Sequence, residues 1–275
     1  MKLGVSELGV SGLTEAFARG RSERRGLLIG YLPAGYPSVP GAVAALHAMV
    51  DGGVDIVEVG LAYSDPMMDG PTIQAAVDRA LAGGVRTRDV LSTVEAVASR
   101  GVPTVVMSYW NPVDSYGVDR FARDLAGAGG SGMITPDLIP EEAAGWLAAS
   151  DSAGLDRIFL VAPSSTGERI SMTASHCRGF IYATAVMGTT GAREATSTRA
   201  PELVARVRAA TDLPVGVGLG VSNGKQAAEV ATYADGVIVG SAFVRCLLEA
   251  ASDSDGQRTV EALAADLAAG VRAHR

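Results

Sequence analysis

Glu58 is a carboxylate inside an otherwise apolar run, in which Ile56, Val57 and Val59 surround it. Continuous apolar runs are typical of parallel strands that are covered on both faces, so the Glu58 side chain is expected to leave water whichever face it takes. A buried, unpaired carboxylate tends to stay neutral by raising its pKa, which suits a proton donor and acceptor near pH 7. The strand therefore carries a candidate acid/base.

Two further carboxylates, Asp65 and Asp69, follow on the loop directly after this strand. Loops at the carboxyl ends of strands are where α/β enzymes keep their chemistry. Gly70 and Pro71 have the character of a helix N-cap and first helical position, since proline is pre-organised there. Asp69 is therefore expected just outside a helix, within reach of the strand end.

These three carboxylates also have interpretations without a catalytic role. Glu58 could pair with an arginine across the interior, and Asp65 and Asp69 could be ordinary turn formers, as most Asp-Pro and Asp-Gly pairs are. The segment alone leaves both interpretations open.

The rest of the chain alternates short apolar runs with helical patterns, which is the rhythm of a βα protein. The expected strands cover residues 27–32, 55–60, 104–109, 132–135, 157–162, 180–184, 215–218 and 236–240. The expected helices cover residues 43–50, 73–82, 90–98, 121–128, 141–149, 168–175, 203–210, 227–233 and 260–271. With 275 residues, the pattern predicts an α/β fold, a single (β/α)8 TIM barrel with extra helices, although an open doubly wound sheet would show the same alternation.

Glycine-rich loops after the last two strands favour the barrel. Residues 218–222 follow the seventh strand, and Gly240 and Ser241 open an apolar helix after the eighth. Paired loops at these places form the usual phosphate site of such barrels, where backbone amides and a helix N-terminus attract the anion. A packing role or a dinucleotide loop is the alternative, but no complete G-x-G-x-x-G opens a first βαβ unit.

Residues 185–199 form a long segment without regular apolar spacing, which is typical of a mobile lid. Gly188 and Gly191 could serve as hinges, and Thr190 offers a polar contact. A surface loop without a role is the alternative.

Composition limits the partners. The net charge is −7, and with no Lys/Arg cluster beyond Arg19, Arg21, Arg24 and Arg25, which are interpreted as solvated surface, we expect no nucleic acid to bind. No run is long enough to span a membrane, and no signal peptide opens the chain, so we expect a cytoplasmic protein without a membrane contact. Two isolated cysteines fit a reducing compartment, and the three histidines suggest no metal site.

The segment around Glu58 resembles the tryptophan synthase alpha subunit, which carries an E-x-G, S-D-P and D-G-P-T-I-Q series. The motifs YLPAGYP, SYWNP, TPDLIP, LVAPSST and VGLGVS extend the resemblance over about residues 28–243, in an actinobacterial style. It implies retro-aldol cleavage of indole-3-glycerol phosphate to indole and glyceraldehyde 3-phosphate. Glu58 and Asp69 match the catalytic pair of that family.

The resemblance also implies roles for residues outside the catalytic pair. The residues matching substrate contacts are Tyr31, Tyr109, Phe180, Tyr182, Thr190, Gly191, Leu219, Gly220, Gly240 and Ser241. Among them, Tyr182 would position the glutamate, Tyr31 and Phe180 would wall the indole pocket, and Thr190 would touch Asp69 in a closed lid. The residues matching the partner-facing surface are Asp65, Pro66, Asn111 and Asp137.

The implied partner is a tryptophan synthase beta subunit in an alpha-beta-beta-alpha tetramer, with pyridoxal phosphate only in that partner and no cofactor or metal in this chain. We expect one domain over residues 1–275, with a helical cap at about 1–25 and the lid at 185–199. One residue departs from the family pattern: Ala62 stands where proline is usual, which puts the rigidity of the docking loop in doubt.

Two other functions remain open. The first is another phosphate-sugar barrel, such as an isomerase, and the second is a weakly catalytic chain that acts mainly as an allosteric partner. A Schiff-base aldolase is disfavoured, because the only lysines, Lys2 and Lys225, lie outside the expected strands.

Overall fold

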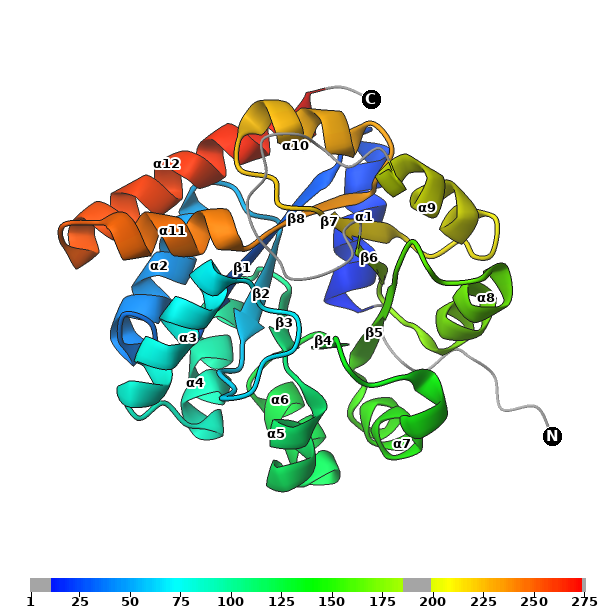
Figure 1. Cartoon of the computed structure of the whole chain (residues 1–275), viewed down its shortest axis with the longest axis horizontal. Coiled ribbons are helices and arrows are strands. Elements are labelled where there is room, and N and C mark those ends of the chain that lie inside the picture. The colour runs from blue at the N-terminus through cyan, green and yellow to red at the C-terminus, as the bar shows by residue number, and fades with distance from the viewer. Residues whose placement is uncertain (1–10, 185–198, 274–275) are drawn as a thin grey trace.

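The computed structural model describes residues 11–184 and 199–273. Eight parallel strands close on themselves in chain order, β1 to β8, so the predicted (β/α)8 barrel is confirmed and the open sheet is excluded. The strands are β1 (Leu27–Pro33), β2 (Ile56–Gly60), β3 (Thr104–Met107), β4 (Gly132–Thr135), β5 (Asp156–Val161), β6 (Ile181–Thr184), β7 (Val215–Gly218) and β8 (Gly236–Val239). Figure 1 shows the strands at the centre and the helices around them.

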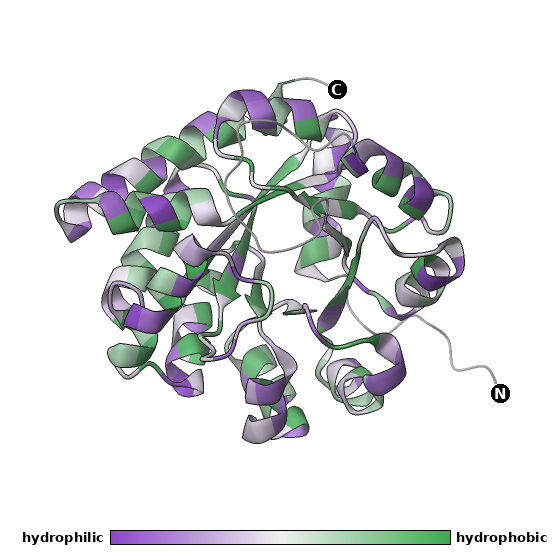
Figure 2. Cartoon of the chain, in the orientation of Figure 1, coloured by the Kyte–Doolittle hydropathy of each residue, from purple (hydrophilic) through white to green (hydrophobic). Residues whose placement is uncertain are grey.

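Helices follow each strand along the chain and cover the barrel from outside (Figure 1). They are α2 (Val39–Asp51), α3 (Pro71–Ala82), α4 (Thr87–Ala98), α5 (Trp110–Tyr116), α6 (Val118–Gly127), α7 (Ala144–Ala153) after the 3-10 turn η1 (Pro140–Glu142), α8 (Gly167–His176), α9 (Arg199–Arg208), α10 (Gly224–Ala231), α11 (Ser241–Glu249) and α12 (Asp253–Arg272). Figure 2 shows mostly hydrophobic strands at the centre, whereas the surrounding helices carry both hydrophobic and hydrophilic residues. This pattern follows from helices that bury one face against the sheet.

Helix α1 (Gly12–Ser22) packs against the barrel interior at the amino ends of the strands. Its Leu13 and Phe17 belong to the same buried cluster as Leu27, Ile56 and Ile238, which point inward from the strands. The barrel interior at the amino ends of the strands is therefore a packed core, and a site can form at the carboxyl ends of the strands.

Arg25 corrects the interpretation of the arginine cluster as solvated surface. Its guanidinium binds both carboxylate oxygens of the buried Asp55, at 2.9 and 3.0 Å, and only 11% of the side chain is exposed. Asp55 also accepts the Leu28 amide at 2.9 Å. This planar, bidentate pair fixes the start of β1 against the approach to β2.

Two helical segments differ from the sequence expectation. Tyr109 was expected to end the third strand, but β3 ends at Met107 and Tyr109 is the N-cap of the unpredicted α5. Asp137, from the loop after β4, accepts the Trp110 amide on both oxygens, at 2.9 and 3.1 Å, and so satisfies the helix N-terminus. The last helix begins at Asp253, seven residues before the expected 260, because Ser252 caps it by accepting the Asp255 amide.

Candidate active site

Glu58 lies in the middle of β2 and is 1% exposed. Its neighbours Val57 and Val59 belong to the core between strands and helices, whereas Ile56 belongs to the inner cluster, so Glu58 shares the inward face with Ile56. Among the described residues, Glu58 Oε1 has no hydrogen-bond partner, and no arginine forms an ion pair with this side chain. Burial alone raises the pKa of Glu58 to about 8, so the group is mostly protonated at pH 7.

Asp69 lies on the loop between β2 and α3, immediately before the N-cap Gly70 and the first helical residue Pro71, as the sequence predicts. The Gln74 side chain holds its backbone by donating to the Asp69 carbonyl at 2.7 Å. Burial raises the pKa of Asp69 to about 6, and a hydrogen bond from Tyr109 opposes this rise. Asp69 is therefore mostly ionised at pH 7, in contrast to Glu58.

Tyrosines from β1 and β6 face both carboxylates. Tyr31 is the direct partner of Glu58 across β1 and β2, and Tyr182 lies on β6. Burial, with the nearby Asp69 and Glu58, keeps the pKa of both phenols above the ordinary value. The structure thus brings Glu58, Asp69, Tyr31 and Tyr182 together at the carboxyl ends of the strands.

Glycines in neighbouring strands make room for these rings. A Cβ at Gly60 would lie 2.4 Å from Tyr31 Oη, and one at Gly218 would lie 2.5 Å from Tyr182 Oη. From the sequence, Gly218 is predicted only as the start of a phosphate loop, and Gly60 has no predicted part in the site. The available signal was a small residue at the inward position that ends a strand, where a larger side chain would fill the interior.

The two loops predicted to bind phosphate lie beside each other. Strand β7 pairs with β8, with Gly218 opposite Ile238, so Gly220 and Gly240 follow at the same level. Gly220 has a φ of +83°, which favours glycine, and Gly240 is the N-cap of α11. No described side chain caps this helix by a hydrogen bond, and free amides at a helix N-terminus are the kind of group that attracts an anion. Ser241 and Leu219 are both buried beside these glycines.

Phe180, the predicted wall of the indole pocket, lies deeper in the barrel than the tyrosines. Phe180 precedes β6 and packs against Phe17 of α1, with ring centroids 5.5 Å apart, one inward position below Tyr182. Thr190 and Gly191 lie outside the described residues, as does the predicted lid up to 198, and Arg199 already begins α9.

The predicted partner surface includes exposed and structural residues. Asp65 is exposed, Pro66 is partly exposed, and Asp65 accepts the Ser64 hydroxyl at 2.5 Å. Asn111 is exposed on α5, and the half-buried Asp137 caps the same helix. Met67 is a large apolar side chain with 71% exposure on the same loop as Asp65.

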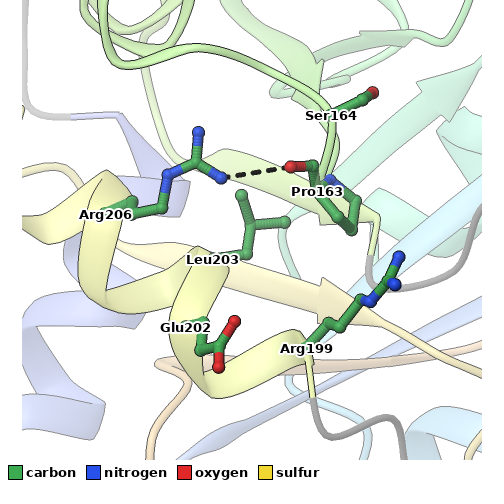
Figure 3. Close-up of a pocket in the computed structure, with 6 residues that line it drawn as sticks. All are labelled: Pro163, Ser164, Arg199, Glu202, Leu203 and Arg206. Carbon is green, nitrogen blue, oxygen red and sulfur yellow. Dashed lines mark hydrogen bonds between the residues drawn. The ribbon is translucent and has the colours of Figure 1, made fainter.

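A separate pocket of about 250 Å³ lies between α9 and the loop after β5 (Figure 3). Arg206 crosses it and donates to the Pro163 carbonyl at 3.1 Å and to the Ser165 carbonyl. Through these two hydrogen bonds the Arg206 guanidinium fixes the loop after β5 to α9. Neither catalytic candidate lines this pocket, which is therefore distinct from the carboxylate site.

Comparison with known proteins agrees with this geometry. Residues 17–272 match the family model described as tryptophan synthase alpha chain. The tryptophan synthase alpha chain of Salinispora arenicola is 63% identical over 268 residues, covering 98% of each chain, and that of Nocardia farcinica is 62% identical over 262 residues, covering 95% of this chain and 96% of the relative. The chain belongs to the tryptophan synthase alpha chain family.

Solved structures show the same likeness. A chain in a structure of Mycobacterium tuberculosis tryptophan synthase has a TM-score of 0.90 at 59% identity, covering 96% of this chain and 99% of that one. The tryptophan synthase subunit alpha of Legionella pneumophila has a TM-score of 0.85 at 32% identity, covering 96% and 99%.

The family identifies the reaction. Tryptophan synthase alpha chains are lyases that cleave indole-3-glycerol phosphate in tryptophan biosynthesis, and this chain is such an enzyme. The prediction of family and activity is confirmed, and the alternative of another phosphate-sugar isomerase is excluded.

Proposed function

We propose that Glu58 and Asp69 divide the chemistry of the cleavage between them. The observation that carries this proposal is their unequal ionisation beside shared neighbours: the pKa of Glu58 is raised to about 8 and that of Asp69 to about 6. Near pH 7 the Glu58 carboxyl group can donate a proton, while the ionised Asp69 carboxylate can stabilise a positive charge on the substrate.

In the first step, Glu58 gives its proton to C3 of the indole ring. The ring becomes cationic at the nitrogen, and the Asp69 carboxylate accepts the indole N–H and stabilises this charge. In the second step, the bond between C3 and the side chain breaks, and its electron pair returns to the ring, which becomes neutral indole. The adjacent hydroxyl loses its proton to the Glu58 carboxylate and becomes the aldehyde of glyceraldehyde 3-phosphate. Glu58 ends as it began, protonated.

The remaining contacts would orient the substrate. Tyr31 and Tyr182 lie over Gly60 and Gly218 and would border the indole ring, with Phe180 below and Leu219 beside them. Gly220, Gly240 and Ser241 would bind the phosphate at the N-terminus of α11, so that binding energy far from the reacting bond contributes to orientation. Thr190 and Gly191 stay predicted contacts of the lid.

We further propose that this chain uses no metal or organic cofactor, since its two carboxyl groups supply both the proton transfer and the charge stabilisation. A tryptophan synthase beta subunit carrying pyridoxal phosphate is the proposed partner, in an alpha-beta-beta-alpha tetramer. Asp65, Pro66, Asn111 and Asp137 are the proposed contacts with it. In the described ranges, no helix is both long and apolar enough to cross a membrane.

Two organisational proposals accompany these. The chain is proposed to form one domain, with its first 25 residues as a cap, which the packing of Leu13 and Phe17 under the barrel supports. A cytoplasmic location is proposed from the acidic composition and the two isolated cysteines.

Indole formation from indole-3-glycerol phosphate tests the residue roles. Glu58→Gln and Asp69→Asn should each lose most of the activity, whereas Asp65→Asn, the same change at an exposed carboxylate of the same loop, should keep it in the isolated chain. Normal turnover by a folded Glu58→Gln variant would refute the proton shuttle. Repeating the assay with and without the beta subunit measures how far catalysis depends on the partner.

A further inference from the structure

Tyr63, a residue with no role predicted from the sequence, makes two contacts with the start of α5. It lies three residues after β2, on the loop that leads to Asp69, and is partly buried. Its ring lies 5.5 Å from the Tyr109 ring, at a tilt of 37°. Its hydroxyl accepts a hydrogen bond from Asn111 Nδ2 at 3.0 Å. The loop is thereby tied to the start of α5 by a ring contact and by a polar one.

The Asn111 side chain is itself held in place. Its Oδ1 accepts the hydroxyl of Ser115, one turn further along α5, at 3.2 Å. This bond directs the amide nitrogen toward Tyr63. Asp137 fixes the beginning of the same helix through the Trp110 amide, so α5 provides a firm support for the Tyr63 ring.

Tyr109 connects Tyr63 to the segment that carries Asp69. Its hydroxyl accepts the Met68 amide at 2.9 Å and so holds the backbone next to Asp69. Hydrogen bonding by the Tyr109 hydroxyl also lowers the pKa of the Asp69 carboxyl. Both contacts require the Tyr109 ring to stay where it is. Tyr63 packs on this ring from the loop side, and a ring that lost this neighbour would be freer to move away from Asp69.

We propose that Tyr63 is a positioning residue for the cleavage reaction, which holds Tyr109 so that the Tyr109 hydroxyl orients the Asp69 carboxylate toward the indole N–H. The inference rests on the proposed role of Asp69. It extends the site outward by one layer, from Asp69 through Tyr109 to Tyr63 and the Asn111 amide. Tyr63 acts through Tyr109 and touches neither the substrate nor the reacting atoms.

Titration of Asp69 reports on this arrangement. Among the described titratable groups, Tyr31 from β1, Tyr109 from the start of α5 and Tyr182 from β6 interact with Asp69, and Glu58 from β2 interacts with the same Tyr31 and Tyr182. Only Tyr109 is in contact with Tyr63. Because the Tyr109 hydrogen bond lowers the pKa of Asp69, loosening it should raise that pKa and move the acidic limb of activity to higher pH.

The test compares Tyr63→Phe and Tyr63→Leu with Tyr116→Phe in the full-length chain. Tyr116 is the matched control, because its hydroxyl is also bonded, to Asp124 Oδ2 at 2.6 Å, and its ring packs on Phe121. Tyr63→Leu removes the ring contact and should lower kcat on the order of tenfold, with KM changed less than about twofold. The acidic limb of the pH–activity profile of Tyr63→Leu should move to higher pH by about half a unit or more. Tyr63→Phe should shift the limb in the same direction by less, and Tyr116→Phe should leave both quantities unchanged.

A double-variant experiment separates positioning from a general loss of stability. In a Tyr109→Phe background the hydroxyl is already absent, so Tyr63→Leu should add almost no further loss of kcat. Independent, additive losses would overturn the proposal. If Tyr63→Leu does not fold, Tyr63→Phe and Asn111→Ala take its place, and an acidic limb at the original pH in both folded variants would overturn it as well.

Asp69→Asn distinguishes this inference from the proposed function. An inactive Asp69→Asn variant combined with unshifted Tyr63 variants refutes only the positioning role. An active Asp69→Asn variant refutes the role of Asp69 and, with it, the basis of the inference.

Discussion

Tyr31 and Glu58 are direct partners across β1 and β2, and the Tyr31 hydroxyl lies over Gly60, the next inward residue after Glu58. Toward the carboxyl end of β2 the next inward position is thus filled by the Tyr31 phenol, and toward its amino end the inward neighbour of Glu58 is the buried Ile56. A carboxyl group between these neighbours is kept out of water. This placement, more than any single hydrogen bond, accounts for its raised pKa.

Glu58→Gln should therefore reduce turnover on the order of 100-fold or more, because the amide keeps the shape but carries no transferable proton. Substrate binding should persist, which equilibrium titration with indole-3-glycerol phosphate would measure in the inactive variant. Retained turnover, or a loss confined to binding, would contradict the role of Glu58.

The same substitution should stabilise the fold at alkaline pH. Since the pKa of Glu58 rises from 4.5 to about 8 on folding, the native state loses stability as pH increases from about 4.5 to about 8, where the buried group must ionise. Glutamine has no such loss, so Glu58→Gln should gain on the order of 3–5 kcal/mol over the natural chain at pH 9 and little at pH 4. Urea unfolding at both pH values measures the difference, and an equal gain at both would refute it.

The pH dependence of kcat/KM should be bell-shaped, because the free enzyme needs Asp69 ionised and Glu58 protonated. Activity should rise with pH through about 6, as Asp69 loses its proton, and fall above about 8, as Glu58 loses its own. The residual activity of Asp69→Asn should lack the lower limb and keep the upper one. Loss of the upper limb instead would reverse the two roles.

Gly240→Val should weaken binding of the phosphate group. An added Cβ would lie 3.2 Å from Tyr31 Cδ1, and the larger side chain would cover the first amides of α11. We expect KM to rise at least about tenfold, with a smaller change in kcat, because the lost contact is remote from the breaking bond. Gly145→Ala is the matched control, since nothing lies within 4 Å of a Cβ at that helical position. Equal effects of both changes on KM would place the phosphate elsewhere.

The barrel and the carboxylate pair could be predicted because their signals are local. Glu58 interrupts an apolar strand, and Asp69 precedes a Gly-Pro helix start, so a few neighbouring residues determine both placements. Helix α5 could not be predicted in the same way: Pro112 suggests a loop, and the carboxylate that satisfies its N-terminus, Asp137, is 27 residues away from Trp110.

The outer layer of the site depends still more on tertiary contacts. Tyr63 accepts its hydrogen bond from Asn111, 48 residues along the chain. It also packs on the ring of Tyr109, which is the N-cap of α5 and not, as the sequence predicts, the last residue of β3. No periodicity or motif in the sequence joins these residues. Their juxtaposition follows from the neighbouring positions of β2 and β3 in the closed barrel.

Ala62 lies at the start of the loop that carries Asp69, and Ala62→Pro should strengthen the proposed docking of this loop on a beta subunit. The Leu61 amide still continues the sheet by donating to the Met107 carbonyl at 2.9 Å, whereas no hydrogen bond from the Ala62 amide is found within residues 11–184 and 199–273. Proline at position 62 would therefore remove no such bond. Because the φ of Ala62 is not positive, proline would also meet no left-handed conformation there. By restricting the unbound loop, proline should stabilise the docked form by about 0.4–1 kcal/mol.

Calorimetric titration of both forms against the cognate beta subunit should therefore show tighter association of Ala62→Pro, by roughly two- to fivefold, together with greater partner-stimulated cleavage. Ala62→Ser is the control, because it leaves the backbone freedom almost unchanged and should bind as the natural chain does. A proline elsewhere, such as Ala48→Pro in the middle of α2, would break a helix and is unsuitable. Equal or weaker affinity of a folded Ala62→Pro variant would show that the alanine does not loosen this loop.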